Sequence, residues 1–258
     1  MTAAVWAQAF PGGVADAELQ HLLARSASGQ VVAVRLADGQ VLWRSAEVLR
    51  PLLLGHGLAL GLAPGTTSTP ARVVALALHE AGAERWRSAP LPWPEWAGQG
   101  DAAAAASEVL HAGWLANRIV LRWHLQPLYR GGAAPGPSRV KAPAVSGTCL
   151  LDMASGALHG AADDQEQVTV SPAPQEPSDD PSVIAQQVLG GVRYSLRQVP
   201  VQARVQAQAQ AQAQAQVPGA VTGMLRTTLT AHDPVRGLDL WHCLLDEAPR
   251  KAPRALRS

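Results

Sequence analysis

The sequence has little phenylalanine, tyrosine, lysine and cysteine, and almost no net charge. Its 258 residues contain one Phe, two Tyr and two Cys, and Lys141 and Lys251 are the lysines among 21 basic residues. The 20 acidic residues leave a net charge of +1, so the chain lacks the broad basic surface that holds nucleic acid. Low charge combined with 47% hydrophobic residues excludes a wholly disordered chain.

The two cysteines, Cys149 and Cys243, lie far apart, and neither belongs to a Cys-x-x-Cys pair. A zinc or dithiol redox site therefore has no signature here, while a single disulfide between them stays open. The longest apolar stretch, 51–64, is interrupted by glycines and is too short to span a bilayer. Residues 1–11 do not resemble a secretory leader. We expect a cytoplasmic protein, or a periplasmic one whose leader was removed.

Familiar catalytic motifs are also missing from the sequence. It contains no Gly-x-Ser-x-Gly, His-Glu-x-x-His, P-loop or Gly-x-Gly-x-x-Gly pattern. The eight histidines are scattered along the chain, and we interpret them as solvated or singly hydrogen-bonded side chains. The sequence therefore assigns no catalytic residue, no metal ligand and no cofactor.

Tryptophan is abundant, with eight residues, and it recurs at the end of an internal repeat. Three segments have an apolar run, a turn and then the pattern Gly-x-x-x-Trp. These pairs are Gly39 with Trp43, Gly82 with Trp86, and Gly237 with Trp241. A fourth segment keeps the run and the turn up to Gly156 but has Gly160 where tryptophan would fall. Each segment is typical of a strand, a tight turn and a second strand.

Two of these turns carry an aspartate four residues before the glycine, namely Asp152 and Asp233. An aspartate side chain at this place can accept hydrogen bonds from the backbone amides two or three residues on. The glycine supplies a positive φ, which other residues adopt reluctantly. We therefore interpret both aspartates as turn-forming residues and not as catalytic acids.

The interval between Gly39 and Gly82 is about 43 residues, the length of one four-stranded propeller blade. The intervals to Gly156 and Gly237 are longer and imply insertions. Strands with an Asp-x-x-Ser-Gly turn and a tryptophan four residues on resemble the quinoprotein-type (PQQ-like) β-propeller repeat, including its non-enzymatic, BamB-like branch. The resemblance covers most of residues 19–250, as repeats. It implies that Trp43, Trp86 and Trp241 pack between neighbouring blades.

We predict an all-β fold of β-propeller-type blades in a single domain, 1–258, with about four recognisable units. Propellers of this family usually have more blades, so the resemblance implies a small or incomplete propeller whose sheet edges are covered by another chain. Residues 161–182 are acidic and proline-rich, and 202–218 contain a strict Gln-Ala alternation. Both are predicted to be disordered or peripheral insertions, and 248–258 form a basic tail.

The expected function is that of a non-catalytic interaction scaffold or accessory subunit from a bacterium, bound to a protein partner or to its own copies. Trp93 and Trp96 fit no repeat position and are candidate partner contacts. Two alternatives stay open. One is a reduced quinoprotein-type dehydrogenase, although the adjacent cysteines usual in that family are missing. The other is a carbohydrate- or peptide-binding module that uses Trp93, Trp96, Trp114 or Trp123.

Deletion of residues 206–216 is expected to leave folding intact, because a polar insertion at a loop position costs little beyond the entropy of loop closure. Thermal unfolding followed by circular dichroism should give a Tm close to that of the full chain. A deletion variant as unstable as a core variant would contradict the interpretation of this segment as an insertion.

Overall fold

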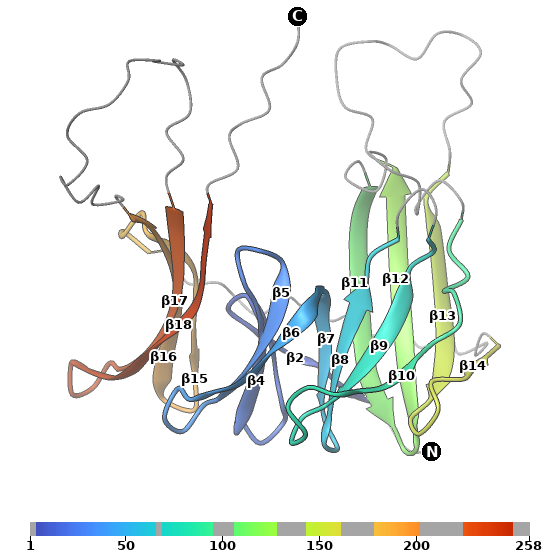
Figure 1. Ribbon diagram of the computed structural model, residues 1–258, viewed down its shortest axis with the longest axis horizontal. Helices are drawn as coiled ribbons and strands as arrows, with labels where there is room; N and C mark the ends of the chain where they lie inside the picture. The colour runs from blue at the N-terminus through green and yellow to red at the C-terminus, as the bar shows by residue number, and fades with distance from the viewer. Residues whose placement is uncertain are drawn as a thin grey trace, which may run out of the picture. The chain divides into compact units, whose positions relative to one another are not determined.

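The computed structural model describes residues 4–65, 69–94, 106–127, 143–160, 178–201 and 224–249. Within these ranges the chain forms antiparallel strands joined by turns, in four sheets of four or five strands (Figure 1). The described part contains no helix long and apolar enough to cross a membrane. The prediction of an all-β fold with about four units is confirmed, and the four sheets are consistent with a small, incomplete β-propeller. Of the predicted insertions and tail, only 178–182 and 248–249 lie within the described residues.

The first sheet is a five-stranded meander in the order β2-β3-β4-β5-β6. Its strands are β2 (Gln8–Phe10), β3 (Gly13–Ala15), β4 (His21–Arg25), β5 (Gln30–Arg35) and β6 (Val41–Val48). The β5–β6 connection is the first repeat turn, with Gly39 at a φ of 72°. The Gly-x-x-x-Trp spacing places Trp43 near the start of β6.

The second sheet has the order β10-β9-β8-β7. Its strands are β7 (Arg50–Gly55), β8 (Leu58–Ala63), β9 (Arg72–Ala77) and β10 (Glu84–Arg87). His56 and Gly57 form the two-residue loop between β7 and β8, with φ of 51° and 73°. Positive φ at both loop residues is the geometry that matches the twist of a tight hairpin. The apolar stretch 51–64 is therefore a hairpin of two buried strands.

The third sheet has the order β1-β11-β12-β13-β14. Its strands are β1 (Val5–Trp6), β11 (Ala106–Leu115), β12 (Arg118–Pro127), β13 (Val145–Asp152) and β14 (Leu158–His159). The N-terminal segment joins two sheets, because β1 pairs with β11 whereas β2 pairs with β3. Between them, the Ala7 amide donates to the carbonyl oxygen of Ala112 at 2.9 Å.

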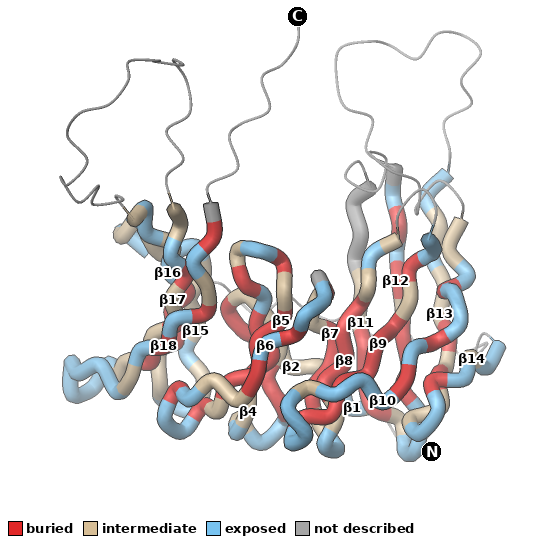
Figure 2. The backbone as a smooth tube through the Cα atoms, in the orientation of Figure 1, coloured by how far each residue is buried: buried red, intermediate tan, exposed pale blue. Residues whose placement is uncertain are grey.

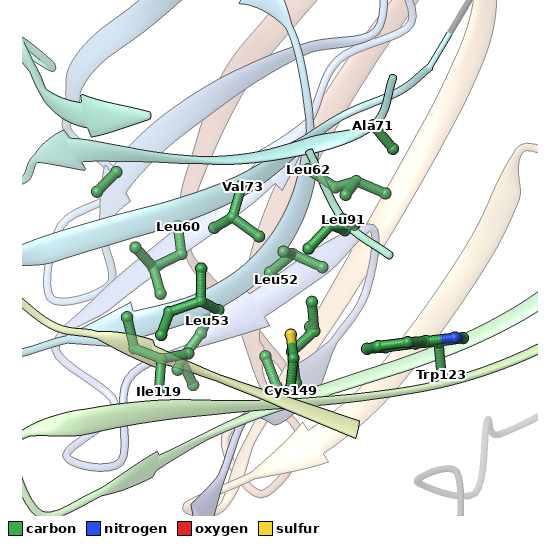
Figure 3. Close-up of a cluster of buried hydrophobic side chains, with 14 of the residues drawn as sticks. Leu52, Leu53, Leu60, Leu62, Ala71, Val73, Leu91, Ile119, Trp123 and Cys149 are labelled. Carbon is green, nitrogen blue, oxygen red and sulfur yellow. The ribbon is translucent and has the colours of Figure 1, made fainter. Parts of the chain in front are cut away.

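Two buried clusters lie on opposite faces of the second sheet. One contains Leu53, Leu60 and Val73 together with Ile119 and Cys149 of the third sheet (Figure 3). The other contains Leu54, Ala59 and Val74 together with Leu23 and Val31 of the first sheet. A sheet that is covered on both faces needs apolar residues at successive positions, since alternate side chains point to opposite faces. This explains why β8 and β9 are continuous apolar runs.

The fourth sheet has the order β15-β16-β17-β18. Its strands are β15 (Val183–Leu189), β16 (Val192–Val201), β17 (Met224–Asp233) and β18 (Leu238–Pro249). Gly190 and Gly191, with φ of 58° and 80°, form the tight turn between β15 and β16. By its internal contacts the chain divides into two units. The first, Met1–Arg25 with Gly29–Pro174, holds the first three sheets, and the second, Ser26–Ser28 with Gln175–Ser258, holds the fourth.

Candidate functional site

The four repeat turns share a glycine at positive φ, and the Gly82 turn is one residue longer than the other three. Their glycines, Gly39, Gly82, Gly156 and Gly237, have φ of 72°, 72°, 69° and 67°. Each glycine amide donates back to a carbonyl across the turn, and the acceptors are Arg35, Ala77, Asp152 and Asp233 at 2.9, 3.2, 2.8 and 2.8 Å. Because a Cβ disfavours this region of φ, glycine is favoured at this place in the turn. The four glycines identified by spacing alone thus have the same φ and the same role in closing the turn.

The two turn aspartates bind backbone amides. Asp152 Oδ1 accepts from the amides of Ala154 and Ser155 at 3.1 and 2.8 Å and from the Ser155 hydroxyl at 2.7 Å. Asp233 Oδ1 accepts from the amides of Val235 and Arg236 at 2.9 and 3.0 Å. The Ser155 hydroxyl bond chiefly lowers the pKa of Asp152, and the Arg236 amide chiefly lowers that of Asp233. Both carboxylates hold the shape of their turns.

Trp43 of the first sheet packs on the repeat turn of the second sheet. Its buried indole ring covers Gly82, where a Cβ would lie 2.8 Å from the ring. The Nε1–H of Trp43 donates to the carbonyl oxygen of Leu78 at 2.8 Å. Leu78 directly follows Ala77, whose carbonyl binds the Gly82 amide. The missing side chain of Gly82 therefore makes room for the indole.

Trp86 of the second sheet packs in the same way on the repeat turn of the third sheet. Its buried ring covers Gly156, where a Cβ would lie even closer to the ring than at Gly82. Its Nε1–H donates to the carbonyl oxygen of Met153 at 2.9 Å, and Met153 directly follows Asp152. We call this arrangement an indole seat: a turn glycine covered by the ring, and the carbonyl that accepts the indole N–H.

The fourth turn has the parts of an indole seat, but no tryptophan of the described residues occupies it. Among the described residues, apart from its two chain neighbours, no heavy atom lies within 4 Å of the position of a Cβ on Gly237. The carbonyl equivalent to those of Leu78 and Met153 is that of Pro234, which directly follows Asp233. Gly160 stands in the third repeat where Trp43 and Trp86 stand in the first two. Trp241 is half-buried, with its ring 6.1 Å from that of Tyr194.

Three of the other tryptophans pack in or against the core, and one lies outside the described residues. Trp114 and Trp123 are only 7% and 6% exposed, within the core between the second and third sheets. The hypothesis that they form an exposed binding surface is therefore wrong. Trp93 is half-buried against the same core, and its buried Nε1 has no hydrogen-bond partner in the described structure. Trp96, the other candidate partner contact, lies outside the described residues.

A cavity of about 410 Å³ lies in the first unit beside the strands β1, β2, β3, β7 and β11. Its lining includes Trp6, Arg25, Arg50 and His111, and none of the described lining residues is an aspartate or glutamate. Burial, and secondarily the charge of Arg50, lowers the pKa of His111. The guanidinium groups of Arg25 and Arg50 suit a ligand with an anionic group better than one with a cationic group. Sequence reasoning missed this cavity, because only strand pairing brings its residues together.

The remaining candidates for chemistry are few among the described residues. No group of three or more His, Cys, Asp or Glu side chains there could hold a metal ion. Cys149 and Cys243 are both buried, and no disulfide joins them. Burial raises the pKa of the Cys149 thiol to about 12, and this thiol is therefore a poor nucleophile at neutral pH.

Substitution of Gly156 tests the indole seat. Gly156→Ala is expected to lower the free energy of unfolding by about 3 kcal/mol, because a Cβ there both strains the backbone and collides with the Trp86 ring. Gly57→Ala is a matched control in the same unit: its φ is 73°, with nothing within 4 Å of its Cβ position. That variant should lose about 1 kcal/mol. Equal losses in urea unfolding would contradict the seat.

The lowered pKa of His111 predicts that the stability of the fold decreases in acid. Because its pKa is lower in the folded than in the unfolded chain, the unfolded chain binds the proton more readily, and stability falls as pH drops below about 6.5. His111→Gln should therefore lose less unfolding free energy than wild type between neutral and mildly acidic pH, by a fraction of a kcal/mol. Urea unfolding at several pH values measures this, and identical pH profiles would contradict it.

Among solved structures, the chain is similar to BamB from Moraxella catarrhalis, with 12% identity and a TM-score of 0.30 over 89% of this chain and 59% of that one. It is also similar to the computationally designed Ika8 protein, with 13% identity and a TM-score of 0.26 over 96% of this chain and 90% of that one. The chain thus spans less than two thirds of the BamB chain. No protein-family model and no curated protein matches the sequence. The all-β fold is shown by the four sheets of this structure and not by these similarities.

Proposed function

We propose that this chain is a non-catalytic interaction scaffold or accessory subunit that binds another protein chain through its fourth sheet. The observation that carries the proposal is the uneven distribution of exposed apolar side chains. Among the described residues, all the exposed large hydrophobic side chains except Val5 belong to the fourth sheet and its turns. They are Ile184, Val188, Val199, Val235, Leu238, Leu240 and Leu244.

The exposure is greatest in the hairpin of β17 and β18. Val235, Leu238 and Leu240 are 91%, 59% and 49% exposed within six residues of one another, and the loop joining the two strands is exposed throughout (Figure 2). A single exposed apolar residue is ordinary, whereas a group of them is typical of a surface that contacts another protein. We name this group, Val235, Leu238 and Leu240, the hairpin patch.

The hairpin does not need these apolar side chains for its own shape. The turn is held by Asp233, which accepts from the amides of Val235 and Arg236 and forms an ion pair with the Arg236 side chain at 3.6 Å. On the flank, His232 Nδ1 and Asp239 Oδ1 are 2.9 Å apart. A hairpin with polar side chains at these three positions would fold equally well, and those side chains would be better solvated. Their apolar character therefore supports a role in binding.

The triple variant Val235→Ser, Leu238→Ser and Leu240→Ser tests this function. Its Tm should stay close to that of wild type, because these side chains are exposed, while binding to the partner or self-association should weaken at least about tenfold. Sedimentation velocity over a range of concentrations measures self-association, and native mass spectrometry of complexes isolated from the natural source measures partner binding.

Val5→Ser is the matched control, because Val5 is also exposed but belongs to the third sheet. It should leave association unchanged. The proposal fails if the wild-type chain stays monomeric at high concentration and is recovered from its source without a partner. It also fails if the triple variant associates as tightly as wild type.

A further inference from the structure

The two occupied indole seats define what such a seat accepts. In both, an indole ring lies flat against a turn glycine, and its Nε1–H reaches a carbonyl at 2.8 or 2.9 Å. The ring must be planar to approach the backbone this closely, and it must carry an N–H at its edge. Phenylalanine has no such donor, and a tyrosine hydroxyl stands at a different place on its ring. The seat is therefore selective for tryptophan.

The fourth turn reproduces the backbone of the Gly156 seat, and within the described part of the chain nothing occupies it. Gly237 has a φ of 67°, and its amide donates to Asp233 at 2.8 Å, compared with 69° and 2.8 Å at the occupied Gly156 turn. The amides bound by Asp233 hold the loop in this form. A site already in its bound conformation loses little entropy on binding. The seat at Gly237 is thus preorganised.

The surroundings of Gly237 suit a neutral aromatic ring. Val235 and Leu238 are exposed on either side of it in the chain. The Asp233 carboxylate is paired with the Arg236 guanidinium, and Asp239 Oδ1 lies 2.9 Å from His232 Nδ1. An approaching indole would meet the apolar atoms of Val235 and Leu238. The only strongly directional group it needs is the carbonyl oxygen of Pro234.

We propose that Gly237 and the Pro234 carbonyl form a binding site for a tryptophan side chain on a β-strand of a separate partner protein. The inference rests on the proposed function and names the chemistry of the partner. The third repeat of this chain does not supply the indole, because Gly160 stands where its tryptophan would fall. Trp43 and Trp86 are already seated, and Trp241 contacts Tyr194 in its own sheet. The partner's strand would cover the hairpin patch as its tryptophan enters the seat.

The test uses the full chain labelled with ¹⁵N and titrated with indole, followed by NMR. Indole should shift the amide signals of 235–238 in a saturable manner. A second titration uses 1-methylindole, which has the same ring without the N–H donor. It should bind about two- to tenfold more weakly, the factor expected for one hydrogen bond.

Gly237→Asn is the diagnostic variant. Asparagine tolerates a positive φ, and its Cβ would have open space among the described residues, so the Tm should change little. The Cβ would nevertheless occupy the place of the ring, and the indole-dependent shifts should disappear. Gly191→Asn is the matched control: this glycine has a φ of 80° and open space in the same sheet. It should leave indole binding unchanged.

Four results would overturn the inference. They are the absence of saturable shifts at 235–238, equal shifts in Gly237→Asn, equal affinity for 1-methylindole, and loss of self-association in Gly237→Asn. The last result would make a second copy of this chain the occupant. The triple variant of the hairpin patch separates this inference from the proposed function. If that variant loses partner binding while indole leaves 235–238 unchanged, the scaffold function stands and the tryptophan seat does not.

Discussion

Packing of a tryptophan on a glycine of the next sheet is the interaction on which the first unit depends. A glycine at positive φ exposes its backbone, the indole ring lies on it, and one hydrogen bond from Nε1 sets the position of the ring. Trp43 thereby joins the first sheet to the second, and Trp86 joins the second to the third. The second sheet, held between these contacts, is covered on both faces. Its strands can be continuously apolar for that reason.

Local chemistry explains which parts of the structure could be predicted from the sequence. The Gly-x-x-x-Trp spacing identified the strand–turn–strand units because a glycine at positive φ and an aspartate that binds amides act within a few residues. The alternation of apolar residues along 118–125 is typical of a strand with one buried face, with Ile119 and Trp123 on the same side, and the structure buries both side chains. Trp114 pairs with Ile119 across the hairpin and shares its buried face.

The cavity could not be predicted in the same way. Arg25, Arg50 and His111 belong to three different sheets, and no spacing in the sequence relates them. They line one cavity because the N-terminal segment crosses from β11 to β3, which draws the inner strands of the first and third sheets together. Long-range strand pairing of this kind leaves no local signal. The seat at Gly237 could be predicted only in part. The sequence shows that Gly160 stands where a tryptophan would fall. The geometry of the two occupied seats was needed to show that the Gly237 turn could accept an indole.

One indole in one seat is too small a contact to hold two proteins together. A stable interface buries on the order of 800 Å² on each partner, several times the surface of a single tryptophan, and association must also offset the lost freedom of both chains. The seat at Gly237 can therefore set the register of a partner strand, while the hairpin patch supplies apolar area beside it. Specificity and affinity would then come from different residues. Blocking the seat should relax the choice of partner strand, whereas polar residues in the patch should weaken binding to every partner.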